Sequence, residues 1–173
     1  YIDCFCGISG DMTVAALLDA GAPADKIVAA INAMGLEGVS VKAESVVKTG
    51  IHATRFVVDI DHHGHHHHHH RHLSDITALI NASSLPDQVK NNSIRTFTIL
   101  GEAEAQVHGT TIDKIHFHEV GAADSIADIV AANLALYELG IEHVICSPII
   151  TGSGTIKCDH GVMPVPAPAT ALL

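Results

Sequence analysis

The sequence is poor in aromatic residues, in cations and in cysteine. Aromatic residues make up 3% of the chain and Trp is absent, so the 47% of apolar residues must build a core from Ala, Val, Ile and Leu. Nine Lys and Arg residues against nineteen Asp and Glu give a net charge of −10 with His neutral. That charge repels nucleic acid and anionic membrane surfaces, and it attracts cations.

The four cysteines do not form a pattern typical of a disulfide framework. Cys4 and Cys6 share one short apolar segment, whereas Cys146 and Cys158 lie far away in a chain of 173 residues, which is long enough to fold without covalent cross-links. We therefore expect reduced thiols and a cytoplasmic location. No run approaches the ~20 apolar residues of a membrane span, and no basic-then-apolar leader is visible. The chain begins at Tyr1 inside an expected strand and ends where a helix is expected to start, which we interpret as a fragment of a longer protein.

Strand and helix patterns are interspersed along the chain. Apolar or β-branched runs predict strands, and apolar residues at helical spacing predict helices. The expected strands are 1–6, 39–47, 51–60, 143–150 and 154–157, and the expected helices are 11–20, 24–34, 74–82 with Ser74 as N-cap, 86–108 and 123–139. This order predicts an α/β or α+β fold, in which residues 1–173 form a single metal-handling domain with a mixed sheet flanked by helices. Residues 61–73 are expected to be a flexible, disordered His-rich loop within it, because such a composition cannot pack as a core.

That loop is the most conspicuous feature of the sequence, with nine histidines in the eleven residues 62–72. Neutral imidazoles bind nickel, copper and zinc, and a flexible run of them holds several ions loosely. We interpret it as a native nickel reservoir rather than an engineered tag or a merely polar loop. Its expected ligands are His62, His63, His65, His66, His67, His68, His69, His70 and His72.

A second group of predicted metal ligands lies in residues 116–128. His116 and His118 are two positions apart, so in an extended segment both project to one side and can bind the same ion, with the Glu119 carboxylate beside them. On the next helix Asp124 and Asp128 are four residues apart, where two carboxylates repel each other unless a cation lies nearby. The alternatives are a polar surface turn for the histidines, and helix-dipole and solvated roles for the aspartates.

Two further pairs carry reactive groups. Glu104 and His108 fall inside the apolar stripe of the long expected helix, where a structural hydrogen bond and a catalytic role are both open. Cys158 and His160 are two residues apart and suit a soft metal ion, or they are a small core residue beside a turn.

A glycine-containing loop joins the first expected strand to the first helix. Its candidate cofactor-binding residues are Gly7, Ser9, Gly10 and Asp11. Backbone N–H groups at a helix start suit a phosphate or a carboxylate, but the charge of Asp11 argues against a bare phosphate. The loop is neither a Walker loop nor a dinucleotide-binding fingerprint.

Several of these segments, in this order, resemble the LarC family of nickel insertion proteins of the lactate racemase cofactor pathway. The resemblance covers nearly the whole chain, and its most specific parts are the glycine loop at 7–12 and the His-Phe-His-Glu stretch at 116–119. Its other parts are residues 3–5, 71–76, 120–125, 152–161 and 164–168. Cys6 stands where this family leads us to expect Ser, which leaves the loop intact.

The resemblance implies a cyclometallase of the lyase class. Its substrate is a pyridinium mononucleotide with two thiocarboxylates, and its product is a nickel pincer with two Ni–S bonds and one Ni–C bond. It also implies CTP with Mn²⁺ or Mg²⁺, bound in a part of the protein C-terminal to this chain, and the apo-racemase as a downstream acceptor. A homo-oligomer remains open.

The chemistry of such a reaction assigns roles to the candidates. His116 and His118 are expected to bind nickel, with Glu119 as the base that accepts the ring proton or as a third ligand. Asp124 and Asp128 are expected to hold the metal or its ligands, and the Glu104–His108 pair is the alternative base. Two other functions stay open: a non-catalytic nickel store or metallochaperone, and a metal-dependent hydrolase.

Overall fold

The computed structural model describes residues 1–60, 71–117, 123–158 and 160–173. Its helices are α1 (Gly10–Asp19), α2 (Ala24–Asn32), α3 (Leu73–Ala82), α4 (Asp87–His108), α5 (Ala123–Glu138) and α6 (Pro168–Leu172), with a short 3₁₀ helix, η1 (Ile112–Lys114). Its strands are β1 (Val39–Lys48), β2 (Ile51–Ile60), β3 (Thr155–Cys158) and β4 (Gly161–Pro164). The predicted mixture of α and β structure is confirmed. In the described part of the chain, however, the strands form two separate antiparallel pairs rather than one mixed sheet.

The β1–β2 hairpin follows the predicted boundaries closely. Val39 pairs with Ile60 and Lys48 with Ile51, so the register holds over the whole length of both strands. Thr49 and Gly50 form the connection, and both have positive φ angles, of 49° and 82°. Positive φ at both central residues is the requirement of a type I′ turn, whose twist matches that of the strands.

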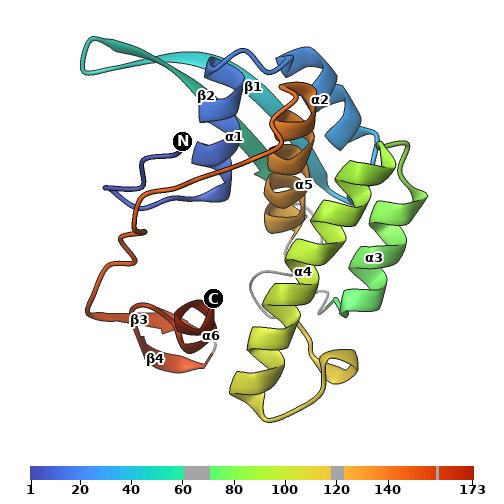
Figure 1. Cartoon of the computed structure of the whole chain (residues 1–173), viewed down its shortest axis with the longest axis vertical. Coiled ribbons are helices and arrows are strands. Elements are labelled where there is room, and N and C mark those ends of the chain that lie inside the picture. The colour runs from blue at the N-terminus through green and yellow to red at the C-terminus, as the bar shows by residue number, and fades with distance from the viewer. Residues whose placement is uncertain (61–70, 118–122, 159) are drawn as a thin grey trace.

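The main core lies between this hairpin and five helices. In Figure 1 the helices α1, α2 and α5 lie together beside the hairpin, and α4 and α3 extend away from them. The inner face of the hairpin contributes Phe56, and the helices contribute apolar side chains such as Ile27, Ile76, Phe97 and Val130, all with at most 2% of their surface exposed. Small and branched aliphatic residues therefore fill most of the interior, as the composition predicts.

Helix α5 buries small residues as well as large ones. Beside Ile126 and Val130, its fully buried residues include Ala131 and Ala135, which lie on the same side as Asp128. Tyr137, near the C-terminal end of the helix, is 41% exposed. The small alanines allow close contact with α1, so the side of α5 that carries Asp128 faces protein rather than water.

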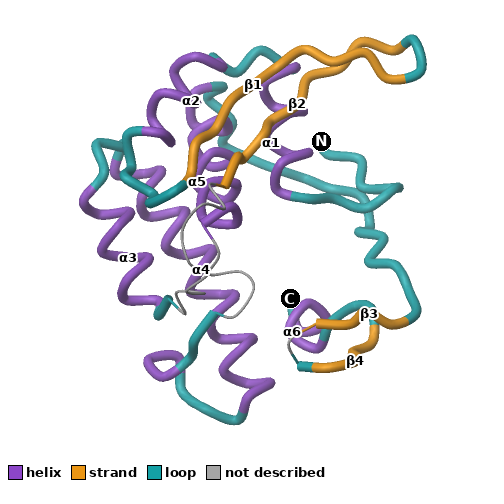
Figure 2. The backbone as a smooth tube through the Cα atoms, turned by 180° about the vertical axis from the view of Figure 1, so that it is seen from behind, coloured by secondary structure: helices purple, strands orange, loops and turns teal. Residues whose placement is uncertain are grey.

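Three expected boundaries or elements are wrong. Helix α3 begins at Leu73 with His72 as its N-cap residue, not Ser74, and the backbone N–H of His72 donates to the Asp75 carboxylate at 2.9 Å. The expected strands 1–6 and 143–150 run side by side in both views but share only one isolated parallel bridge, between Ile2 and Cys146 (Figure 2). The segment 143–150 has the apolar composition of a buried strand, yet most of it is exposed, and Ile145 is 66% exposed.

The chain ends in a small substructure of its own. Strands β3 and β4 pair antiparallel from Thr155↔Pro164 to Cys158↔Gly161, and α6 follows them. Helix α6 contacts α4, so the hairpin lies near the C-terminal half of that long helix (Figure 1). Among the described residues, no helix combines the length and the apolar character that crossing a membrane requires.

Candidate functional site

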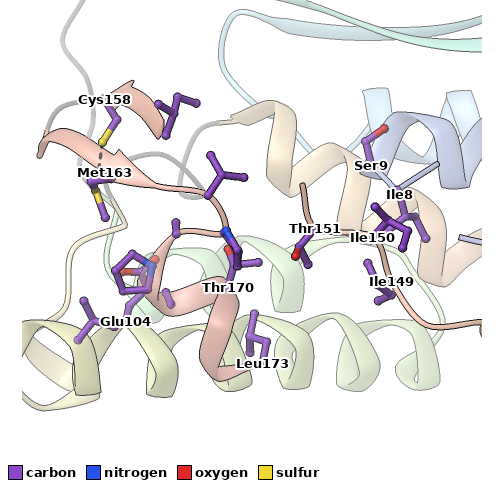
Figure 3. Close-up of a pocket in the computed structure, with 18 of the residues that line it drawn as sticks. Ile8, Ser9, Glu104, Ile149, Ile150, Thr151, Cys158, Met163, Thr170 and Leu173 are labelled. Atoms are coloured by element: carbon purple, nitrogen blue, oxygen red, sulfur yellow. Dashed lines mark hydrogen bonds between the residues drawn. The ribbon is translucent and has the colours of Figure 1, made fainter. Parts of the chain in front are cut away.

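A cavity of about 1030 Å³ lies between the C-terminal half of α4, the glycine loop and the β3–β4–α6 substructure. Figure 3 shows Ile8 and Ser9 of the glycine loop at one end of it, Cys158 and Met163 at the other, and Glu104 on the α4 wall. Segment 149–151 and α6 complete the lining. Side chains from five separate stretches of sequence therefore meet around one space, which is large enough for a mononucleotide.

The α4 wall of the cavity carries a carboxylate and an imidazole. Glu104 Oε2 lies 3.7 Å from His108 Nε2, and the two side chains retain 25% and 30% exposure. The i, i+4 spacing that sequence analysis singled out thus places both groups at the rim of the cavity rather than in the core. Both groups keep access to water and to a bound molecule.

The second predicted pair lies beside the first. The His160 ring is 5.1 Å from the His108 ring, centroid to centroid, and the Cys158 thiol lies 3.3 Å from the Met163 sulfur. Cys158 and His160 both line the same cavity as Glu104 and His108. Two pairs that are about fifty residues apart in sequence, and that were separate candidates, therefore share one site.

The glycine loop forms another part of the lining through Gly7 and Ser9. Gly7 has a φ of 87°, and a Cβ atom at this position would lie 3.3 Å from the Ile150 carbonyl oxygen, so glycine allows the loop to approach segment 149–151 closely. Ser9 is the N-cap residue of α1, and its hydroxyl donates a hydrogen bond to the Asp11 carboxylate. The start of α1 is thus already occupied by an internal carboxylate.

Three carboxylates gather where α1 meets α5. Burial, with Asp11 and Asp124 nearby, raises the pKa of Asp128 from 3.8 to about 6, although the Asp11 backbone N–H donates to its carboxylate. The Asp128 Oδ1 atom is buried without a hydrogen-bond partner. A Cβ atom on Gly10 would lie 2.6 Å from the Asp128 side chain, so only glycine allows this contact. The predicted Asp124–Asp128 pair and the predicted loop residues Gly10 and Asp11 are thus neighbours.

His116 lies at a third place, next to the end of the histidine tract. Its ring centroid is 4.0 Å from that of His72. The next residue, Phe117, lines the cavity and packs edge-on against Phe97, with 6.2 Å between the ring centroids. Gly101 of α4 permits this packing, because a Cβ atom there would already be 3.3 Å from Phe117 and Ile112.

The structure does not test every predicted ligand. His118, Glu119 and the tract histidines from His62 to His70 lie outside the described residues. Within the described ranges, no three His, Cys, Asp or Glu side chains are placed to hold one metal ion. The metal ligands that sequence analysis proposed, among them Asp124, Asp128, Cys158 and His160, therefore stay predictions.

Sequence analysis also missed several members of the site. Met163, Phe117 and the segment 149–151 line the cavity. Of these, only Phe117 is next to predicted ligands in the sequence, and the others carry no local signal. The contact between His72 and His116 joins positions 44 residues apart, and no local pattern indicates it.

Comparisons with known proteins place the whole chain in one group. The family described as "Nickel insertion protein" matches residues 1–173. Proteins named pyridinium-3,5-bisthiocarboxylic acid mononucleotide nickel insertion protein are similar to it: that of Geobacillus kaustophilus is 50% identical over 98% of this chain and 43% of its own length. Those of Clostridium kluyveri and Staphylococcus epidermidis are 46% and 44% identical over 98% and 99% of this chain, and 45% and 42% of their own. The chain thus spans less than half the length of these relatives, and no solved structure matches it.

Proposed function

This chain belongs to the nickel insertion protein family, and we propose that it supplies the nickel-handling and substrate-holding part of a nickel insertion enzyme. The proposed substrate is the one in the relatives' name, pyridinium-3,5-bisthiocarboxylic acid mononucleotide. The observation that carries the proposal is the cavity, where Glu104, His108, Cys158 and His160 meet the glycine loop. Imidazole, carboxylate and thiol groups beside a largely apolar space suit a reaction that moves a nickel ion and a proton at an aromatic ring.

The proposed reaction requires an exchangeable nickel ion and a proton acceptor. Ni²⁺ arrives on imidazole nitrogens, which release it to the two thiocarboxylate sulfurs of the substrate. The C–H bond of the ring carbon between them then breaks heterolytically, so that the electron pair of carbon forms the Ni–C bond and the proton passes to a base. Nothing is oxidised or reduced in this step, and only a positioned base is needed.

We assign the delivery of nickel to His116, together with the predicted ligands His118 and Glu119. The proton acceptor in the cavity is the Glu104–His108 pair, whose 3.7 Å separation allows the proton to be shared or passed on to water. Glu119, the base that the sequence analysis placed first, lies outside the described residues and is kept here as the alternative base.

In the full-length protein we propose a lyase reaction that depends on CTP with Mn²⁺ or Mg²⁺. The glycine loop of this chain does not fit a triphosphate, because Asp11 and Asp128 place carboxylates at the start of α1. We therefore propose that CTP binds outside residues 1–173. The reduced cysteines suit the cytoplasm, where an apo-racemase would accept the product.

The test uses the full-length protein with Ni²⁺, CTP and the bis-thiocarboxylate substrate, and measures the nickel product by mass spectrometry. Glu104→Gln and His108→Gln are expected to lower the rate at saturating nickel by about 10²-fold or more. Glu102→Gln is the matched control, because Glu102 is exposed on the same helix. If both cavity variants insert nickel at the wild-type rate, the base is elsewhere. If the wild-type protein forms no nickel product, the proposed function is wrong.

The delivery step has its own test. His116→Ala and His118→Ala in the full-length protein are expected to abolish insertion at limiting nickel, with the tract intact and an unchanged circular dichroism spectrum. Glu119→Gln should keep nickel bound if Glu119 is the base, and should lose it if Glu119 is a ligand.

A nickel store or metallochaperone is the second candidate, and the nine histidines of residues 62–72 favour it. A store binds several nickel ions per chain and leaves the substrate unchanged. The same mixture therefore distinguishes the two functions by the presence of the Ni–C product.

A further inference from the structure

The residues that end the histidine tract, Arg71 and His72, lie beside His116 and Phe117. The backbone N–H of Phe117 donates to the Arg71 carbonyl oxygen at 3.2 Å, and these two residues form an isolated antiparallel bridge. The bridge brings the neighbouring rings of His72 and His116 to a centroid distance of 4.0 Å at an interplanar angle of 45°. Two imidazoles from separate segments are thus held together by backbone contacts rather than by chance proximity of surface side chains.

The His72 ring is oriented by a hydrogen bond. Its Nδ1 atom lies 3.0 Å from the carbonyl oxygen of Ile115. A carbonyl oxygen only accepts, so this bond requires the proton on Nδ1 and leaves the lone pair of the neutral ring on Nε2. Histidines that bind metals commonly donate their other ring N–H to a backbone carbonyl in this way, because the bond fixes both the tautomer and the ring plane.

The backbone around His72 is equally well held. Its N–H donates to the Asp75 carboxylate at 2.9 Å, and His72 is the N-cap residue of the ten-residue helix α3. On the other segment, Ile115 and Phe117 flank His116 and are only 3% and 2% exposed. Both imidazoles are therefore attached to well-anchored backbone, which lowers the entropy that binding a shared ion would cost.

We propose that His72 and His116 together bind a nickel ion. Imidazole nitrogen is a good ligand for nickel, and two imidazoles with water in the remaining positions give a site from which the ion exchanges readily. The described residues supply no third His, Cys, Asp or Glu at this place, and the predicted ligands His118 and Glu119 lie outside the described residues.

The position of the pair gives it a role, which rests on the proposed function. His72 is the last histidine of the tract, and His116 precedes Phe117, which lines the cavity. A nickel ion held by this pair is bound next to the tract in sequence and beside a residue that lines the space where the substrate is proposed to bind. The pair is therefore the entry point through which nickel passes from the tract to the insertion site.

The experiment measures nickel binding by this chain without substrate. Residues 62–70 are replaced with a Gly/Ser linker to remove the bulk of the tract, and the protein is titrated with NiSO₄ by calorimetry. His72→Asn is the decisive variant, since its amide can still donate to the Ile115 carbonyl and cap α3, but it lacks the Nε2 ligand. We expect His72→Asn and His116→Asn each to weaken the tightest nickel site by about 10-fold or more. The double variant should be no weaker than the single ones, because either change removes the same site.

Paramagnetic NMR provides an independent signature. Each imidazole bound to Ni²⁺ should give one shifted, exchangeable ring N–H resonance, and each variant should remove its own resonance. The control is His52→Asn, because His52 is exposed on β2. If His72→Asn binds nickel as tightly as its parent, or if the ring N–H resonance of His72 is not shifted, the paired site does not exist.

This outcome is separate from that of the proposed function. Nickel binding by the pair is measured without CTP or substrate, so it fails or succeeds regardless of whether the full-length protein makes the nickel product. If the pair binds nickel and the full-length protein inserts it, His72→Asn should slow insertion at limiting nickel and leave the rate at saturating nickel unchanged. An unchanged rate at limiting nickel would refute the entry role of the pair but not the existence of the nickel site.

Discussion

The Asp128 carboxyl is expected to destabilise the metal-free protein above about pH 6. Burial, with Asp11 and Asp124 adding to the effect, raises its pKa from 3.8 to about 6. A rise of this size corresponds to at most about 3 kcal/mol. Because the side chain is only half-buried, solvent screening reduces the expected penalty to about 1 kcal/mol. The folded protein holds this proton more tightly than the unfolded chain, so the penalty is absent below pH 3.8, grows up to about pH 6 and is constant above it.

The substitution Asp128→Asn removes the charge and keeps the shape. The amide oxygen can still accept from the Asp11 N–H, and the amide N–H₂ can donate toward the neighbouring carboxylates. At pH 7.5 we expect the free energy of unfolding to rise by about 1 kcal/mol and the Tm by about 2–4 °C. Both gains should shrink as the pH falls from 6 and should vanish below pH 4.

The assay is urea unfolding followed by circular dichroism, in EDTA, at several pH values between 4 and 7.5. Glu102→Gln removes an exposed carboxylate and is the control for the change in net charge. No gain at pH 7.5, or a gain of the same size at pH 4, would refute the reasoning. Repeating the series with added Ni²⁺ tests the predicted metal role, because a cation bound by the aspartates would stabilise the wild-type protein more than the variant.

Three other predictions follow from the same structure. Gly10→Ala should lower the free energy of unfolding by about 1–3 kcal/mol in the same urea assay, because the added Cβ would lie 2.6 Å from the Asp128 side chain. An unchanged free energy of unfolding would show that α1 and α5 can move apart at no cost. Replacing residues 62–72 with a Gly/Ser linker in the full-length protein should lower the nickel stoichiometry measured by metal analysis, while the rate of insertion at saturating nickel stays near that of the wild type. A loss of insertion at saturating nickel would mean that the tract takes part in the chemistry. Residues 1–173 should bind Ni²⁺ but not Mn-CTP in calorimetric titrations, because the carboxylates at the start of α1 disfavour a triphosphate. Micromolar binding of Mn-CTP would place the nucleotide site in this chain.

Local patterns predicted the elements well where the pattern and the packing agree. The β1–β2 hairpin could be placed because its strands alternate and the Thr49–Gly50 connection favours a tight turn. The long helix α4 could be placed because Pro86 and Gly109 mark its two ends. The side of α4 that carries the polar residues Arg95, Glu102 and Gln106 is exposed.

Packing between distant segments could not be predicted from such patterns. The sequence of 143–150 has the composition of a buried strand, but burial depends on a neighbour, and the described residues provide only one bridge to the N-terminal segment. On α5 the small residues Ala131 and Ala135 are buried because α1 packs closely against them, and a helical wheel that favours large side chains misses this. The cavity is lined by five stretches of the chain. The Glu104–His108 and Cys158–His160 pairs could therefore each be identified from the sequence, but their proximity to one another could not.

Because Gly101 has no side chain, it affects the geometry of the proposed site. A glycine inside a helix lowers the stability of the helix by about 1 kcal/mol relative to alanine, so a glycine in the middle of α4 needs a structural reason. The reason visible here is that Phe117 rests directly on the helix at this point, with 3.3 Å between its ring and the position a Cβ would occupy. Phe117 follows His116, and Glu104 lies three residues beyond Gly101 on α4. Helix α4 thus sets the spacing between His116, the proposed nickel ligand, and Glu104, the proposed proton acceptor, and we expect a single methyl group at position 101 to widen that spacing without altering either residue.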